Sequence, residues 1–290
     1  MNPAENLLRF LPWRYRSLSN WRYANANRLF KRVLSTPPME CQTEAQIEVH
    51  SLVCRRDFYM YLMAAKSFLL HCPDVSLVVH DDGSLTEQDA VLLNWHLPGC
   101  RLILRASADR ELNSLLPEHI ANMRMKHVFM LKVFDFNLLN RGGRTLMLDS
   151  DILFIQPPEE VQHWIDSKEN TIFYNQDPLQ DTCRATPIPS DYPHHFNSGF
   201  MGWPTALTLE QILQIVVPLN YFGEDQTLYG CLCRGMETTA LPKNRYFVRD
   251  GGSLPAEACL IHFISTYRFT DQLYVNLSRT VIEQLSARRM

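Results

Sequence analysis

Two carboxylates interrupt an apolar stretch near the middle of the chain. Residues 146–148 are Leu-Met-Leu, then come Asp149, Ser150 and Asp151, and residues 152–154 are Ile-Leu-Phe. An apolar run of this kind is buried in a folded protein, and charges inside it are costly unless they are paired or bound to a cation. Oxygen ligands favour Mg²⁺ or Mn²⁺, and such a cation can neutralise a departing diphosphate. We therefore predict a divalent metal at Asp149 and Asp151; the alternative is a strand-end turn whose aspartates cap nearby amides.

The segments around this motif alternate between strand and helix patterns, which predicts an α/β fold with a mainly parallel central sheet and helices on both faces. Ligands of such sheets gather at the carboxyl ends of strands, and Asp149 follows a predicted strand directly. The loop 177–195 is long and rich in Pro, Asp and Thr, so we predict that it shapes the active site as a lid. Strands are predicted at 47–53, 75–80, 102–104, 145–148, 152–155, 171–174, 199–203 and 260–264, and helices at 57–70, from Thr86 onward, and at 121–139.

Composition excludes several classes of protein. The chain has 290 residues, of which 46% are apolar and 20% charged, so it can bury a large core and is not disordered. No apolar stretch reaches the roughly 18 residues that span a bilayer. The net charge of −3 argues against a nucleic-acid binder held by bulk positive charge.

Positive charge is concentrated at the N-terminus. Residues 1–36 carry seven basic side chains against one acid, Glu5, a net +6 that leaves −9 for the remainder, and aromatic residues are interleaved with them. We predict a basic aromatic N-terminal arm at 1–38 and one domain at 39–290. The arm either packs its aromatics on the domain or lies on an anionic membrane.

The cysteines and the N-terminus favour a cytoplasmic protein, with the arm as the means of any peripheral membrane contact. None of the eight cysteines forms a CxxC pair, which favours reduced thiols. Arg9, Pro12 and Arg14 interrupt any apolar core of a signal peptide.

The acidic motif resembles the DxD motif of GT-A-fold glycosyltransferases. The chain is most similar to glycosyltransferase family 8, the retaining enzymes that include lipopolysaccharide galactosyltransferases and glycogenin. The resemblance extends from about residue 47 to 270, and several more segments match in order. They are Ala-Ala-Lys-Ser at 64–67, Phe-Asn-Ser-Gly-Phe-Met at 196–201, Glu-Asp-Gln-Thr-Leu at 224–228, Leu-Pro-Lys-Asn-Arg-Tyr at 241–246, and Ile-His-Phe at 261–263.

This resemblance implies a GT-A, Rossmann-like fold and transfer of a hexose from a nucleotide-diphosphate sugar, UDP by default, to a hydroxyl acceptor that is carbohydrate, lipid-linked or of another kind. It implies that His262 completes the metal site, and two carboxylates with one imidazole suit Mn²⁺ or Mg²⁺. Cations beside the phosphates would stabilise the leaving group. The implied donor contacts are Lys132, Asn197, Ser198, Arg268 and Asp149, and the implied catalytic residues are Gln226, beside the anomeric carbon, and Asp225.

The sequence departs from the family pattern at two places, and three other functions stay open. Cys54, Arg55 and Arg56 stand where the family often has an acidic pair for the nucleotide, and Arg268 stands where its last motif has Lys. A haloacid-dehalogenase-type phosphatase would use Asp149 as nucleophile. A catalytically weak GT-A-like domain would bind or act as a scaffold without turnover. An inverting transferase would use Asp225 as general base.

Overall fold

A mixed sheet of seven strands forms the centre of the computed structural model, which describes Pro12, Ser17, Leu18, Asn20, Trp21, Asn25 and residues 30–287 except 168, 186–187, 222, 265–266 and 271. The strand order is β3-β2-β1-β4-β7-β6-β8, and β7 runs antiparallel to both of its neighbours while the other pairs are parallel. This confirms the predicted mainly parallel α/β sheet. The strands are β1 (Ile47–Val53), β2 (Ser76–Asp81), β3 (Arg101–Ile103), β4 (Arg144–Leu148), β6 (Ile172–Gln176), β7 (Phe196–Trp203) and β8 (Thr238–Ala240).

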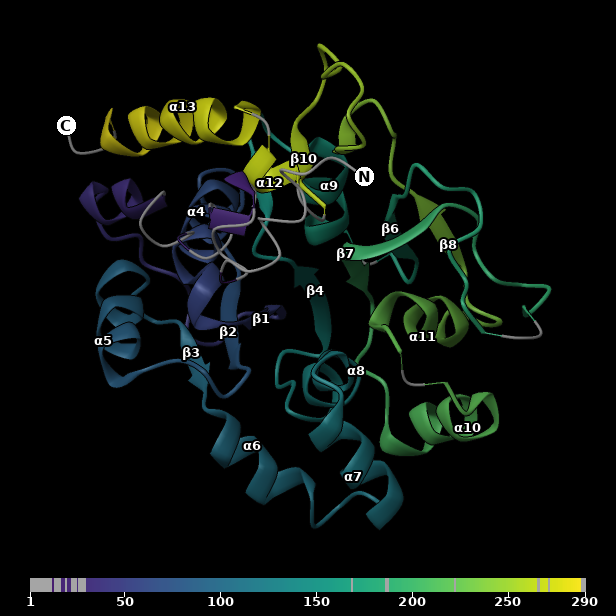
Figure 1. Cartoon of the computed structure of the whole chain (residues 1–290). Helices are drawn as coiled ribbons and strands as arrows, with labels where there is room; N and C mark the ends of the chain where they lie inside the picture. The colour runs from purple at the N-terminus through teal and green to yellow at the C-terminus, as the bar shows by residue number, and fades with distance from the viewer. Residues whose placement is uncertain are drawn as a thin grey trace.

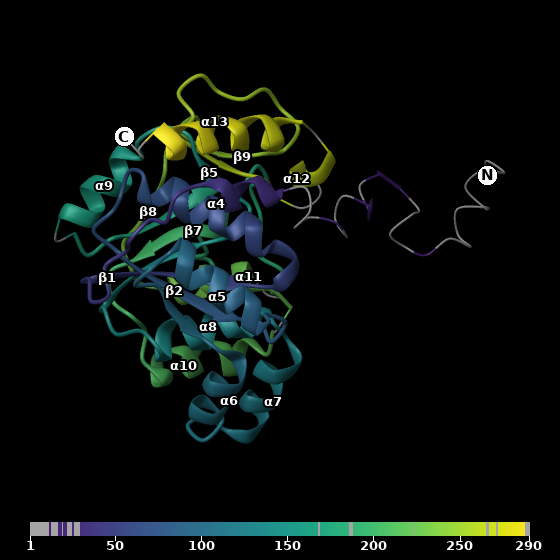
Figure 2. The ribbon, with the colours of Figure 1, turned by 90° about the vertical axis from the view of Figure 1, so that its left-hand side faces the viewer.

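Helices cover both faces of this sheet, as Figure 2 shows with α4 and α13 above the strands and α8 and α10 below them. Side chains alternate along β4, so Leu146 and Leu148 join the core under α4 while Met147 joins the core under α8. The helices are η2 (Lys31–Ser35), η3 (Arg55–Asp57), α4 (Phe58–Leu69), α5 (Glu87–His96), α6 (Arg105–Leu112), α7 (Glu118–Lys126), α8 (Phe129–Leu138), α9 (Glu159–Asp166), α10 (Leu209–Leu219), α11 (Asp225–Leu232), α12 (Tyr267–Thr270) and α13 (Leu273–Ala287).

A second, three-stranded sheet of order β5-β10-β9 lies beside the first, close to α4 and α13 (Figure 1). Its strands are β5 (Ile152–Phe154), β9 (Tyr246–Val248) and β10 (Leu260–His262). Because β5 follows the acidic motif and pairs antiparallel with β10, this small sheet brings the end of the chain back to the centre.

The predicted strand 199–203 begins earlier, at Phe196, the predicted strand 260–264 ends at His262, and one predicted helix is wrong in its extent. The helix expected over 121–139 is two helices, α7 and α8, because His127 has extended backbone angles (φ −117°, ψ 104°) that end α7. The apolar periodicity continues across this break, so the sequence pattern alone indicates one helix. By contrast, the predicted start of a helix at Thr86 is confirmed by a capping box in which Thr86 and Asp89 bond each other's backbone amides.

Most of the predicted N-terminal arm lies outside the described residues. The end of that segment is described and belongs to the packed core: Phe30 and Val33 are buried, and Phe30 meets Tyr274 of α13 edge-to-face with ring centroids 4.8 Å apart. Within the described part of the chain, no helix is long and apolar enough to cross a membrane.

Candidate metal and donor site

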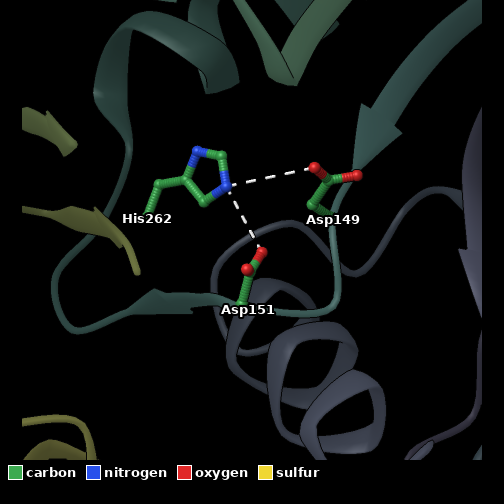
Figure 3. Close-up of side chains that lie close together, drawn as sticks. All are labelled: Asp149, Asp151 and His262. Atoms are coloured by element: carbon green, nitrogen blue, oxygen red, sulfur yellow. Dashed lines mark ion pairs between the residues drawn. The ribbon is translucent and has the colours of Figure 1, made fainter. Parts of the chain in front are cut away.

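Three strand ends bring together the three predicted metal ligands. Asp149 follows β4, Asp151 precedes β5, and His262 ends β10 opposite Ile152 in the antiparallel pair. Figure 3 shows the imidazole facing both carboxylates, with Nε2 of His262 3.3 Å from Asp151 Oδ1 and 3.9 Å from Asp149 Oδ2. The candidate ligand atoms all lie within 4.8 Å of one another. Residues from distant parts of the sequence thus form one cluster at the carboxyl end of β4.

Gly199 of β7 makes room for the His262 ring. A Cβ atom at position 199 would lie 2.1 Å from Cε1 and 2.7 Å from Nδ1 of His262. The strand backbone cannot retreat easily, because the Gly199 carbonyl accepts a hydrogen bond from the Asp149 amide at 2.9 Å. The glycine of the Phe-Asn-Ser-Gly segment is therefore required by the close approach of the imidazole to the strand.

The hydrogen bonds of Asn197 show which nitrogen of the His262 ring carries a hydrogen. Asn197 Nδ2 donates to Asp177 Oδ2 at 3.1 Å, and Asn197 Oδ1 accepts the Gly199 amide at 3.1 Å. The oxygen of Asn197 is therefore the atom 3.1 Å from His262 Nδ1, which must carry the hydrogen. In the neutral ring this leaves the Nε2 lone pair directed at Asp149 and Asp151.

This donor set fits a divalent cation. Two carboxylates and an imidazole lone pair converge, and a partner on the far nitrogen of the ring orients it as metal-binding histidines are oriented. Burial by itself would lower the pKa of His262, but the carboxylates of Asp151 and Asp149 outweigh burial and raise it. The cluster thus attracts positive charge to the place where the three side chains meet.

The two predicted phosphate-binding cations lie in the cluster but contact carboxylates. Lys132 of α8 donates to Asp149 Oδ1 at 2.7 Å and to Asp225 Oδ2 at 3.0 Å. Arg268 of α12 donates from Nη1 to Asp151 Oδ2 at 2.9 Å. Burial would raise the pKa of Asp151, but His262 and Arg268 together lower it to about 2. Burial would lower the pKa of Lys132, and its two carboxylate partners raise it instead.

The remaining predicted site residues line the same place. Asp225 and Gln226 begin α11, which packs on β7. Ser198 Oγ donates to Asp225 Oδ2 at 3.0 Å, and Asn197 Nδ2 donates to Gln226 Oε1 at 3.2 Å. The nine predicted site residues therefore form two hydrogen-bonded groups, which the ion pair between His262 and Asp149 at 3.9 Å joins. One group contains Asp149, Lys132, Asp225 and Ser198, and the other contains Asp151, His262, Arg268, Asn197 and Gln226.

Asp177 contributes to the site although it is not among the predicted site residues. It begins the loop 177–195, and its buried carboxylate contacts Asn197. Lys66, in the segment that resembles the family's first helix, donates to Thr36, to the Pro37 carbonyl and to His96. Its partners belong to the N-terminal segment and to α5, so it anchors these elements.

Solved structures of glycosyltransferases have the same fold. Mouse xyloside xylosyltransferase 1 aligns over 79% of this chain and 99% of its own with 13% identity and a TM-score of 0.50. The galactosyltransferase LgtC, solved with donor and acceptor sugar analogs, aligns over 80% and 95% with 14% identity and a TM-score of 0.52. The glycosyltransferase GlyE of Streptococcus pneumoniae TIGR4 aligns over 85% and 64% with 14% identity and a TM-score of 0.53.

Comparison of the sequence itself gives no relative, since no protein-family model and no curated protein matches the chain. The likeness is therefore one of three-dimensional structure, and it confirms the fold that the acidic motif and its neighbouring segments imply. The chain has the GT-A fold of glycosyltransferases.

Proposed function

We propose that the protein is a divalent-metal-dependent glycosyltransferase that moves a hexose from a nucleotide-diphosphate sugar, UDP by default, to a hydroxyl acceptor with retention of configuration. The observation that carries this proposal is the convergence of Asp149, Asp151 and His262 beside Gln226 on a GT-A fold. Bound Mn²⁺ or Mg²⁺ would neutralise the diphosphate as it departs.

Charged side chains of the cluster hold the donor phosphates. Lys132 has three ammonium hydrogens, and its two carboxylate bonds leave one for a phosphate or sugar oxygen. Arg268, bonded to Asp151, adds a second positive charge to the same cluster. Positive groups fixed here stabilise the negative charge that develops on the leaving group. Asn197 and Ser198 fix the orientation of the residues that face the sugar.

Gln226 is the side chain proposed to lie beside the anomeric carbon. Its Oε1 accepts one hydrogen bond from Asn197 and keeps a second lone pair for a developing oxocarbenium centre. The bond from C1 to the diphosphate oxygen breaks with its electrons on the phosphate. The acceptor oxygen bonds C1 on the same face, and its proton passes to the departing phosphate oxygen.

One observation favours this course over inversion through Asp225. The Asp225 Oδ2 atom accepts hydrogen bonds from both Lys132 and Ser198, so a cation already compensates its charge. The Oδ2 atom is therefore occupied by two donors and is not free to take a proton from an acceptor hydroxyl. Asp225 is then a residue that orients Lys132 and the donor sugar.

A screen of nucleotide sugars for Mn²⁺-dependent hydrolysis tests the function, because a slow reaction with water needs no knowledge of the acceptor. We expect release of one nucleoside diphosphate that stops on chelation. NMR of the first-formed sugar then decides its course: an α product from an α-linked donor supports retention, and a β product makes Asp225 the general base. Binding of metal and nucleotide without release would instead identify a binding or scaffold domain.

The acceptor and the location are proposed more broadly. The loop 177–195, which connects β6 and β7 next to α11, is proposed to shape the acceptor site, because the Arg184 amide donates to Thr227 Oγ1 of α11 at 3.0 Å. We propose a cytoplasmic protein whose basic N-terminal residues contact an anionic membrane.

A further inference from the structure

We propose that Asp177 is a positioning residue that sets the direction of the hydrogen bonds joining the metal ligand His262 to Gln226. The claim about hydrogen-bond direction stands on geometry, while its consequence for donor hydrolysis rests on the proposed function.

Both oxygens of Asp177 act as acceptors in a buried place. The residue follows β6 directly and is 7% exposed. Its Oδ1 accepts the Leu179 amide at 3.0 Å, and its Oδ2 accepts Asn197 Nδ2 at 3.1 Å. An ionised carboxylate offers no hydrogen, so the amide group of Asn197 can present only its NH₂ to Asp177.

The orientation of the Asn197 amide group determines two further contacts. The second hydrogen of Asn197 Nδ2 goes to Gln226 Oε1, so the Gln226 oxygen faces Asn197. The oxygen of Asn197 then lies on the other side, where it accepts from His262 Nδ1 and from the Gly199 amide. A reversed Asn197 would place NH₂ against the Gly199 amide and would favour a hydrogen on Nε2 of His262, where the cation must bind.

Hydrogen bonds between Asp177 and His195 hold the two ends of the loop 177–195 together. Its amide donates to the His195 carbonyl at 2.6 Å, and His195 Nδ1 lies 3.0 Å from the Asp177 carbonyl. His195 has a positive φ of 54°, which is uncommon for a residue other than glycine, so the backbone turns sharply where the loop ends. The ends of the loop and the ligand His262 are thereby connected through one carboxylate.

Asp177→Asn is the decisive variant, because an amide of the same shape cannot accept at both positions. Either its NH₂ meets the Leu179 amide or it meets the NH₂ of Asn197, and the second arrangement reverses Asn197. Asp181→Asn is the matched control: Asp181 lies in the same loop, is exposed, and its Oδ1 accepts the Cys183 amide at 3.2 Å.

The first readout is the hydrogen bond from His262 Nδ1–H to Asn197 Oδ1 in the Mg²⁺-loaded protein, measured by ¹⁵N and ¹H NMR. The signals are assigned by their loss in His262→Asn. We expect a slowly exchanging Nδ1–H signal in the wild type and in Asp181→Asn, and fast exchange or loss of this signal in Asp177→Asn. Absence of a protected Nδ1–H in the wild type overturns the proposal, and this measurement does not require any variant to fold.

The second readout is Mn²⁺ affinity, followed by the electron paramagnetic resonance of the free ion. Loss of a residue that orients a metal ligand costs about 10- to 100-fold in affinity, and we expect this loss in Asp177→Asn alone. A folded Asp177→Asn protein with the wild-type protection of the His262 Nδ1–H and the wild-type Mn²⁺ affinity overturns the proposal.

Failure of the proposed function gives a different result. If the wild type hydrolyses no nucleotide sugar, the function is wrong, yet the Nδ1–H hydrogen bond of His262 and the Mn²⁺ affinity still decide the role of Asp177. If the wild type is active, Asp177→Asn is expected to lower kcat through Gln226, while saturating Mn²⁺ restores metal occupancy but not kcat.

Discussion

At the scale of single residues, the site requires glycine at position 199 as well as the three candidate metal ligands. The His262 ring occupies the space above Gly199 that any Cβ would fill. The Gly199 carbonyl accepts the Asp149 amide, so the backbone here is held, and overpacking at this place would displace the ring from its contacts with Asn197 and Asp151. A methyl group at position 199 would therefore push the imidazole away from Asp149 and Asp151.

Gly199→Ala is expected to lower Mn²⁺ affinity at least tenfold and to cost about 1–3 kcal/mol of stability. Gly202→Ala is the control on the same strand, because its Cβ would meet the Phe173 ring at 2.2 Å in the core and not the site. Titration of both variants with Mn²⁺, with urea unfolding alongside, separates the effects. Equal Mn²⁺ affinity in the two folded variants would contradict this account of Gly199.

The residues that the sequence predicts and those it misses differ for a physical reason. Asp149 and Asp151 are found because they interrupt an apolar run, where a charged group needs an explanation, and His262 is found through the resemblance of Ile-His-Phe at 261–263 to the family's last motif. Asp177 is missed because its contact with Asn197 depends on the pairing of β6 with β7. A register shift between Tyr174 and Asn175 alters that pairing, and no periodicity in the sequence reveals it.

At the scale of elements, Lys66 joins three segments through a buried amino group. Its Nζ donates to Thr36 Oγ1 at 2.8 Å, to the Pro37 carbonyl at 2.6 Å and to His96 Nδ1 at 2.9 Å. These acceptors are neutral, since burial lowers the pKa of His96 to about 4, and burial lowers the pKa of Lys66 to about 7. The hydrogen bonds of Lys66 thus connect the segment before β1 and the end of α5 to α4, and no carboxylate takes part in them.

This arrangement predicts a stability that rises with pH. Above pH 7 the folded protein has lost the proton of Lys66, whereas the unfolded chain keeps it until about pH 10.4, so the unfolded state binds more protons. Stability should therefore increase between pH 7 and 9, by up to about 1.4 kcal/mol per pH unit. Lys66→Met should remove this increase, and exposed Lys243→Met should keep it. If the free energy of unfolding in urea changes with pH equally in the wild type and in Lys66→Met, the explanation is wrong.

The elements themselves were predicted well where burial and turn chemistry agree. The alternation of apolar strands with helices gave the sheet and its helices, and the capping residues Thr86 and Asp89 marked the start of α5. The break between α7 and α8 is not predicted, because no Pro or Gly stands within 121–139 to mark it. Both helices bury apolar side chains, among them Ile120 and Met130, in the same core cluster.

At the scale of the whole molecule, truncation of the basic N-terminal residues tests the proposal that they bind a membrane. Residues 1–29 carry Arg9, Arg14, Arg16, Arg22 and Arg28 against Glu5, a net charge of 5 − 1 = +4. A variant lacking residues 1–29 is expected to lose binding to vesicles with anionic lipid, at about 1 kcal/mol per basic residue, and to keep donor hydrolysis. Vesicle binding equal to that of the full chain would contradict the membrane proposal.

The position of the cut matters, because the next residues belong to the core. Phe30 and Val33 are buried, and Thr36 holds Lys66. Removal of residues 1–36 is therefore expected to lower the stability of the domain, whereas removal of 1–29 is not. Unfolding of the two truncated proteins in urea provides the control for the vesicle measurement.

The order of the strands also explains why the sequence predicts the site only in part. Strands β4 and β7 and helices α8 and α11 come from separate stretches of the chain, and β5 with β10 returns His262 to them (Figure 1). The family resemblance predicted which residues meet. It placed Lys132 and Arg268 on phosphates, and the structure adds that they are bonded to Asp149, Asp225 and Asp151.

The central claim is that Asp149, Asp151 and His262 hold a cation needed to break the bond between sugar and diphosphate. It is tested most directly by the rate of Mn²⁺-dependent donor hydrolysis in wild type and Asp151→Asn, with exposed Asp74→Asn as control. The account predicts a loss of roughly a hundredfold or more in folded Asp151→Asn and an unchanged rate in Asp74→Asn. Hydrolysis by Asp151→Asn at the wild-type rate, or hydrolysis by the wild type that persists after all divalent metal is removed, would contradict it.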